Sequence, residues 1–420
     1  MRFRLTVLAA LAVLAAPAHA QVSFHAIWGS GLGDIWAVGG NGAAAHFSGG
    51  AWSMVPTGMR VELRAVWGSG PGDVYAAGDG GALVHWNGTA WSTVATGVTR
   101  DLVAIAGCSA SDVTVLGQSG DEREQPLVLH FDGRTWTSSQ RLGVAARAAG
   151  LVAACPGLVF AGASYFDPKP NERRNVGVVA RVRAGTWTLS GWNGQHVTDP
   201  MVGGTSWSRI AGGGGTIALM GIGDNGERAI VVSSRAGGWT RVPAPTDLPR
   251  NADLDRAAFG VADGAPVLVF RDGFARWVGG QWQVVTAETR NAGMEDASRQ
   301  MQALNLRQGQ VPTPEQIRQI QQIQQAALAQ MGNIQAMAQR AMALQLGDDP
   351  AIWAPASGGF YVATEHGRVV RITGDDARVA FDQMCLNPSM ASMPQCQAPT
   401  APASSMPTPV RRPKAARARP

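Results

Sequence analysis

The sequence predicts an all-β protein, a seven-bladed β-propeller with a helical insertion between its last two blades. Residues 27–55 and 66–94 are near copies of each other, "IWGSGLGDIWAVGGNGAAAHFSGGAWSMV" and "VWGSGPGDVYAAGDGGALVHWNGTAWSTV". Their tryptophans Trp28 and Trp67 are 39 residues apart. A period near 40 residues built from short apolar runs is typical of a propeller, in which each repeat forms a four-stranded blade.

The second repeat contains four expected strands, each rich in β-forming residues and bounded by Gly, Pro, Asn or Asp. They read "LRAVWGS", "DVYAAG", "ALVHWNG" and "WSTVAT". The Gly-containing pair before the fourth strand suits a hairpin turn that needs a positive φ. Because one such unit cannot bury both of its faces, copies are expected to pack side by side until a ring closes.

Five weaker copies follow. The tryptophan that opens the fourth strand recurs in six repeats and is absent from the seventh: Trp52, Trp91, Trp136, Trp187, Trp239 and Trp282. This pattern places the first six blades in residues 21–285 and the last blade in residues 350–382. Seven repeats predict seven blades, with six or eight as alternatives because the later copies are weak.

Two polar residue types recur in the first three repeats. Aspartates precede the second strand, at Asp34, Asp73 and Asp112. Histidines stand six residues before the fourth-strand tryptophan, at His46, His85 and His130. We expect the carboxylates to bond backbone N–H groups in the tight turn, the histidines to pack beside the tryptophan, and the tryptophan to cover the seam between blades. Equivalent positions on separate blades diverge and cannot converge on one metal ion, so neither a metal site nor a cofactor is predicted.

The motif "WGSGPGDVYAAG" followed by "HWNGTAW" resembles the secreted bacterial propeller repeats related to the BNR, or Asp-box, group. The resemblance is close over residues 24–97 and loose over the rest of the ring. It departs from the strict pattern Ser-x-Asp-x-Gly-x-Thr-Trp, because "FDGRTW" at 131–136 lacks a residue between Asp132 and Gly133. The group includes sialidases, sortilin-like receptors and photosystem assembly factors, so the resemblance implies a fold and does not choose an activity.

The two ends of the chain differ from the ring in composition. Residues 1–20, "MRFRLTVLAALAVLAAPAHA", are typical of a secretory signal peptide. No other apolar run reaches the about 18–20 residues of a membrane span, so we expect a periplasmic or extracellular protein with no transmembrane segment after processing. Residues 383–420 are poor in core-forming residues and are expected to lack stable structure. Their last ten residues carry five positive charges and no acid, which makes them a candidate contact for an acidic polymer or an anionic surface.

Four cysteines in an exported chain favour disulfides, and three pairings are possible. Cys108 and Cys155 stand at matching places at the ends of the first strand of adjacent repeats. Cys385 and Cys396 flank a short Pro-containing loop just after the ring. We therefore expect the pairs Cys108–Cys155 and Cys385–Cys396.

Residues 286–349 interrupt the repeat spacing and are rich in Gln, Ala and Met. The stretch "TPEQ" at 313–316 predicts a helix start with a Thr cap, Pro at the first position and Gln at the third. An apolar stripe at helical spacing follows for about 50 Å, and a shorter helix is expected at 294–306. This helical hairpin buries its own apolar stripe, lies on the ring, or acts as a docking arm. The expected contact residues of the arm are Ile317, Ile320, Leu328, Met331 and Ile334.

The sequence predicts a non-enzymatic scaffold in the cell envelope that binds an envelope or extracellular protein. The alternative is a glycan-binding or sialidase-like propeller that uses the loop at 163–174. The candidate residues of that loop are Tyr165, Asp167, Glu172, Arg173 and Arg174. A solvated blade loop would explain the same residues. A deep pocket with converging Arg and carboxylate groups would favour the glycan alternative, and a flat face would favour protein binding.

Overall fold

The computed structural model describes residues 22–118, 124–139, 146–155, 157–166, 174–183, 186–190, 205–223, 225–233, 238–249, 252–286, 313, 315–322, 343–347, 350–355 and 358–386. Within them, seven antiparallel four-stranded sheets follow one another along the chain. The first strand of each sheet lies against the first strand of the next, and that of the seventh lies against that of the first. The prediction of a seven-bladed propeller is therefore confirmed.

The strands of the first four blades have the following bounds. Blade 1 holds β1 (Phe24–Gly31), β2 (Asp34–Gly39), β3 (Ala44–Ser48) and β4 (Ala51–Met54). Blade 2 holds β5 (Leu63–Gly70), β6 (Asp73–Gly78), β7 (Leu83–Trp86) and β8 (Trp91–Thr93). Blade 3 holds β9 (Leu102–Ser109), β10 (Asp112–Gly117), β11 (Leu127–Phe131) and β12 (Trp136–Ser139). Blade 4 holds β13 (Arg147–Ala153), β14 (Leu158–Phe166), β15 (Arg174–Arg183) and β16 (Thr186–Ser190).

The remaining blades complete the ring. Blade 5 holds β17 (Thr205–Gly213), β18 (Thr216–Gly223), β19 (Arg228–Ser233) and β20 (Trp239–Val242). Blade 6 holds β21 (Ala258–Ala262), β22 (Ala265–Phe270), β23 (Gly273–Val278) and β24 (Gln281–Thr286). Blade 7 holds β25 (Ala351–Trp353), β26 (Phe360–Ala363), β27 (Arg368–Thr373) and β28 (Asp376–Asp382). Short 3-10 helices occur at Gly40–Gly42, Asp79–Gly81 and, after β28, at Gln383–Leu386.

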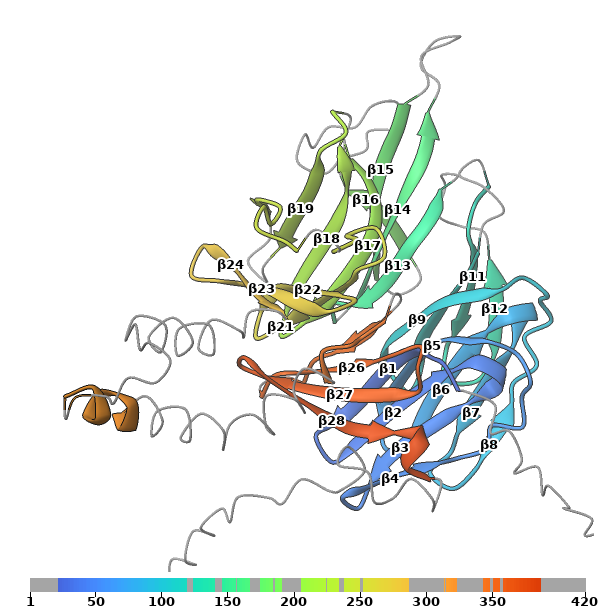
Figure 1. Ribbon diagram of the computed structural model, residues 1–420. Coiled ribbons are helices and arrows are strands. Elements are labelled where there is room, and N and C mark those ends of the chain that lie inside the picture. The colour runs from blue at the N-terminus through green and yellow to red at the C-terminus, as the bar shows by residue number, and fades with distance from the viewer. Residues whose placement is uncertain are drawn as a thin grey trace, which may run out of the picture.

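The two ends of the ring are joined by packing and by two hydrogen bonds, because no blade takes a strand from both ends of the chain. The red blade 7 lies against the blue blade 1 in Figure 1. The Phe24 N–H donates to the Thr364 carbonyl at 3.0 Å, and the Val22 N–H donates to Gln383 Oε1 at 2.8 Å. The folded chain thus reaches past residue 382, into the segment expected to lack structure.

The core of the protein consists of apolar clusters in the seams between neighbouring blades. Each of six seams receives the fourth-strand tryptophan of one of its two blades, half-buried against the cluster. The prediction that this tryptophan covers a seam is therefore confirmed. A fully buried aromatic side chain typically contributes about 3–5 kcal/mol, as judged by its truncation to Ala.

The seam between blades 6 and 7 is different, because the seventh repeat has no fourth-strand tryptophan. Its cluster instead includes Ala343, Leu344 and Leu346, which have no exposed surface. The Leu346 N–H also donates to the carbonyl of Arg271 at 2.7 Å. The last described residues of the insertion are therefore part of the core of the ring.

The direction of the strands gives the ring two unlike faces. Turns between strands one and two and between strands three and four lie on one face, which we call the turn face. Turns between strands two and three and the connections between blades lie on the opposite face, the loop face. Every connection of more than six residues, the insertion included, is on the loop face. Both described ends of the chain, at residues 22 and 386, lie there as well.

Candidate functional site

A polar cluster recurs on the turn face of the first three blades. In blade 1, Asp34 accepts a hydrogen bond from Ser30 Oγ at 2.6 Å and pairs with His46 Nε2 at 2.7 Å. The same contacts join Ser69, Asp73 and His85 in blade 2, where the His–Asp distance is 2.7 Å. In blade 3, Asp112 pairs with His130 at 3.0 Å.

These contacts correct the predicted roles of both residue types. All three carboxylates bind an imidazole, and those of blades 1 and 2 also bind a hydroxyl group, whereas backbone N–H groups were expected. The histidine stacks on a residue of the second strand rather than on the fourth-strand tryptophan. His46 lies 3.8 Å from Trp36 between ring centroids, and His85 lies 4.2 Å from Tyr75. Burial, with a smaller contribution from Asp73, raises the pKa of Tyr75 to about 12.

The serine, aspartate and histidine of this cluster do not form a catalytic relay. In a hydrolase triad the imidazole lies between the hydroxyl and the carboxylate. Here the carboxylate lies between the other two groups, so the histidine cannot take a proton from the serine. A second group, Ser23, His25 and Glu62, also fails, because the hydroxyl and the carboxylate contact the same nitrogen, Nε2 of His25.

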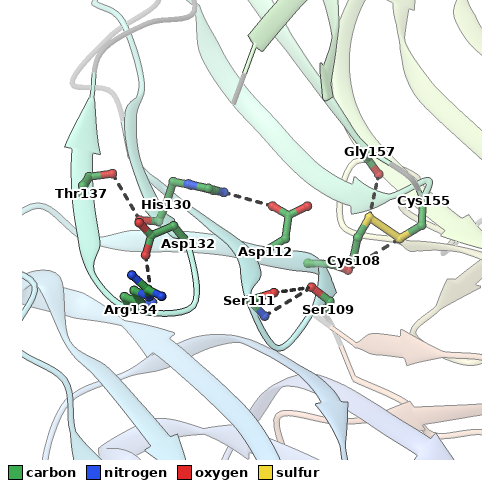
Figure 2. A network of polar contacts seen from close by, with 11 residues as sticks. Cys108, Ser109, Ser111, Asp112, His130, Asp132, Arg134, Thr137, Cys155 and Gly157 are labelled. Carbon is green, nitrogen blue, oxygen red and sulfur yellow. Dashed lines mark hydrogen bonds and ion pairs between the residues drawn. A yellow bond between two sulfur atoms is a disulfide. The ribbon is translucent and has the colours of Figure 1, made fainter. Parts of the chain in front are cut away.

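Blade 4 breaks the pattern of this polar cluster. Strand pairing aligns Gly157 with Asp112 and Arg181 with His130, because Arg181 faces Val159 as His130 faces Thr114. Figure 2 shows Asp112 directed toward His130, with Gly157 beside the disulfide on the neighbouring blade. Arg181 is exposed, and among the described residues no carboxylate forms an ion pair with it.

The expected disulfide Cys108–Cys155 is present on this same face. It joins the ends of the first strands of blades 3 and 4, with a Cα–Cα distance of 5.5 Å (Figure 2). Cys385 is also disulfide-bonded. Its expected partner Cys396 lies outside the described residues, so that pairing remains a prediction.

A hollow of about 830 Å³ lies at the axis of the ring, lined by the first strands of all seven blades. Most of the side chains that line it are apolar or absent, as in glycine, although polar atoms make up more of its surface than apolar atoms do. Among the described residues that line it, Arg181 alone carries a charge. Three half-buried tryptophans of adjacent blades form one side, Trp353, Trp28 and Trp67. Cys155 and the glycine turn at 213–215 are at its turn-face end.

The tryptophans of the hollow also connect neighbouring blades. An added Cβ at Gly29, Gly68 or Gly107 would lie 2.8, 2.7 or 2.6 Å from the ring of Trp353, Trp28 or Trp67, respectively. Each ring thus packs on a glycine of the next blade, which explains the Trp-Gly pair in the repeat. Blades 3 to 6 carry smaller side chains at the tryptophan position. By strand pairing these are Ala106, Val152, Ala211 and Gly260. The hollow exists because those four side chains do not reach the axis.

The sequence prediction did not include the residues of this hollow. Its signal was present in the pattern, since tryptophan occupies this first-strand position in three repeats and a small residue occupies it in four. The histidine position likewise changes to Arg181 in the fourth repeat. In the sequence these departures look like the general weakness of the later copies, whereas the structure places them together.

The candidate glycan loop lies at the tip of a long hairpin. Strands β14 and β15 remain paired as far as Phe166 and Arg174, beyond the last pairs that β13 and β16 make with them. Tyr165, paired with Asn175, and Arg174 are thus on a two-stranded extension on the loop face. Asp167, Glu172 and Arg173 lie outside the described residues.

The insertion contains a helix at 315–322 with the predicted start. The Thr313 N–H donates to Gln316 Oε1 at 2.9 Å, and the Gln316 N–H donates to Thr313 Oγ1 at 3.3 Å, which together form a capping box. Ile317 is 43% exposed and Ile320 is half-buried. Leu328, Met331, Ile334 and the helix expected at 294–306 lie outside the described residues.

Two features are absent from the described part of the chain. No three His, Cys, Asp or Glu side chains in these residues gather as they would around a metal ion. No helix within them has the length and apolar character needed to cross a bilayer.

Comparisons with known proteins identify no family. No protein-family model and no curated protein matches the chain. Among solved structures, the chain is similar to the WD40 β-propeller domain of Doa1, with 9% identity, a TM-score of 0.44, and 85% of this chain and 92% of that chain covered. It is also similar to YCF48 bound to D1 peptide, with 11% identity, a TM-score of 0.43, and coverage of 63% and 81%. A third structure, SapL1 lectin in complex with alpha methyl fucoside, has 15% identity, a TM-score of 0.41, and coverage of 63% and 97%. None of these similarities indicates what this chain binds.

Proposed function

We propose that this protein is an exported, non-enzymatic propeller that binds another protein of the cell envelope through its insertion. The carrying observation is that the insertion has a buried C-terminal segment and an exposed helix. Ala343, Leu344 and Leu346 are held in the seam between blades 6 and 7. The helix at 315–322 begins with its own capping box and exposes Ile317.

This arrangement supports a docking role in physical terms. Because the anchor is part of the ring, the insertion leaves the ring at a defined place on the loop face. Amphipathic helices dock into grooves through apolar residues three and four positions apart, which is the spacing of Ile317 and Ile320. The apolar stripe continues in the sequence to Leu328, Met331 and Ile334.

Export and the absence of catalysis belong to the same proposal. The signal-like segment ends at Ala20, and Val22 already bonds to Gln383 at the junction of the ring. The disulfide Cys108–Cys155 suits an oxidising compartment. Neither Ser–His–acid group of the described residues has the order that catalysis needs.

The test compares the full wild-type chain with two surface variants. Ile317→Glu combined with Ile320→Glu would place charge on the apolar stripe, whereas Gln319→Glu changes an exposed residue of the same helix and serves as the control. Quantitative affinity capture from the native envelope should recover a partner with the wild-type protein and with the control, and lose it with the double variant. Equal capture by all three proteins, with equal thermal melting, would contradict the docking role of the helix.

The glycan alternative is supported by the protruding β14–β15 hairpin, which carries Tyr165 and Arg174 on the loop face. A glycan-array screen of the wild-type protein and of Arg174→Ala tests it. Binding that is lost in the variant would favour the glycan function over protein docking.

A further inference from the structure

We propose that the axial hollow is a binding site for a small amphipathic anion, with its apolar body against the tryptophan wall and its negative group at Arg181. This site is on the axis of the ring and does not depend on the insertion. It therefore goes beyond the protein-binding function proposed above, and either proposal can fail alone.

The size and lining of the hollow indicate a small molecule. A volume of about 830 Å³ falls within the roughly 300–1,000 Å³ of typical ligand pockets. Such pockets are mostly apolar and aromatic, with a few placed polar groups. Trp28, Trp67 and Trp353 supply the aromatic surface, and Val152, Ile210 and Phe259 face them from blades 4 to 6. Among the described residues no Asp or Glu lines the hollow, so no carboxylate there opposes an anion.

The charge of the ligand follows from the position of Arg181. Five other blades carry a histidine or an arginine at the position equivalent to Arg181, and each of these side chains has a partner. Histidines pair with aspartates on blades 1 to 3. Arg276 pairs with Asp375 at 2.9 Å, and Arg371 lies 5.8 Å over the ring of Tyr361. Among the described residues at this position, Arg181 is the one cation that has no such partner. Its side chain lines the hollow.

The two departures from the repeat therefore coincide in space. Small side chains replace tryptophan and open the hollow, and glycine replaces aspartate and leaves Arg181 without its anion. Positions where a regular pattern is broken without local compensation are where function is expected. A guanidinium binds carboxylate and sulfonate groups through charge-assisted hydrogen bonds.

The probes are 8-anilinonaphthalene-1-sulfonate, an aromatic body with one negative charge, and the uncharged N-phenyl-1-naphthylamine. Energy transfer from tryptophan to the bound dye reports binding to the protein, and the variants below localise the site. For a ligand of about 20 non-hydrogen atoms a dissociation constant of tens of micromolar is expected. No saturable binding of the sulfonate by the wild-type protein would overturn the proposal.

The decisive variant fills the hollow with a residue that the repeat itself uses. Val152→Trp places a tryptophan at the position of Trp28, and the neighbouring residue of the next blade is Gly212, the same arrangement as Trp28 with Gly68. This variant should keep the wild-type melting temperature or exceed it, and should lose at least about tenfold in affinity for both dyes. Unchanged affinity in a folded Val152→Trp protein would show that the dyes bind elsewhere and would overturn the proposal.

Arg181→Gln tests the anionic end of the ligand separately. It should weaken the sulfonate about fivefold and leave the uncharged dye unaffected, because exposed ion pairs contribute modestly. Arg241→Gln, an exposed arginine that does not line the hollow, is the matched control and should change neither affinity. If Arg181→Gln and Arg241→Gln bind the sulfonate equally well, the assignment of Arg181 is wrong.

Discussion

The seam between blades 1 and 2 and the seam between blades 6 and 7 have the same place in the ring but different contents. The first is filled by aromatic side chains of the repeat, Trp36, Trp86 and Trp91, whose ring centroids lie 5.0–5.8 Å apart. The second lacks the fourth-strand tryptophan and contains Ala343, Leu344 and Leu346 from the insertion. The geometry of the ring requires apolar volume in each seam, and segments outside the repeat can supply it.

The same contrast holds for the polar residues of the turn face. Blades 1 to 3 join the second and third strands with an Asp–His pair. Blade 4 has lost the aspartate, and Arg181 is exposed at the hollow. Regular repeats thus use these positions for stability, whereas the irregular blade leaves them available for other contacts.

The largest effect is expected from the seam between blades 6 and 7. The double variant Leu344→Ala, Leu346→Ala removes two fully buried side chains, and such truncations each cost about 2–5 kcal/mol. Ile317→Ala, in the exposed helix of the same insertion, should change stability by less than about 0.5 kcal/mol. Denaturant unfolding of the three proteins makes the comparison. A double variant as stable as Ile317→Ala would mean that Leu344 and Leu346 do not contribute to the stability of the core.

A smaller effect is expected from the glycine on which Trp28 packs. A Cβ at Gly68 would lie 2.7 Å from that ring and 2.6 Å from the Asp73 carbonyl, so Gly68→Ala should cost about 1–3 kcal/mol through overpacking. A Cβ at Gly70, in the same strand, would meet nothing within 4 Å. Thermal melting should therefore separate Gly68→Ala from Gly70→Ala. Equal melting temperatures would show that the groups around Gly68 shift at little energetic cost to accommodate the added methyl group.

The contrast on the turn face predicts that His85→Ala and Arg181→Ala differ by about 1 kcal/mol in unfolding free energy. His85→Ala removes a hydrogen bond to Asp73 and the stacking on Tyr75, a loss of roughly 1–2 kcal/mol. Arg181→Ala, at the equivalent position of blade 4, removes neither kind of contact and should be close to neutral. Denaturant midpoints measure both changes. A loss in Arg181→Ala as large as that in His85→Ala would contradict the distinction between the two blades.

The smallest effect concerns the pH dependence of stability. Blade 2 has the ionisable side chain of Tyr75 at the position where blade 1 has Trp36, which does not ionise. The pKa of Tyr75 is raised to about 12, whereas an unfolded tyrosine loses its proton near pH 10. Tyr75 therefore contributes stability that is complete below about pH 10 and is lost as the pH rises toward 12. Between about pH 9 and pH 11 the wild-type protein should lose more unfolding free energy than Tyr75→Phe. Equal losses of unfolding free energy in the two proteins would show that ionisation of Tyr75 does not contribute to alkaline unfolding.

Much of this protein is determined by local sequence patterns. The 39-residue period, the alternation of β-forming and turn residues, the fourth-strand tryptophan and the capping box at Thr313 each depend on near neighbours in the chain, and the structure has all four. The disulfide Cys108–Cys155 was also predictable, because matching positions of adjacent blades lie side by side in a ring.

Other features were decided only by contacts between distant residues. The sequence did not show that Leu344 and Leu346 enter the last seam, because apolar residues near the end of a predicted helix are equally compatible with a free helix. It did not show that the repeated aspartates bind histidines, since the pairs are 12 to 18 residues apart and form only after the strands align. The hollow depends on four small side chains from four blades, which share one volume only once the ring is closed. Local patterns fix the unit that is copied, whereas closure of the ring decides what each copy contacts and where space remains.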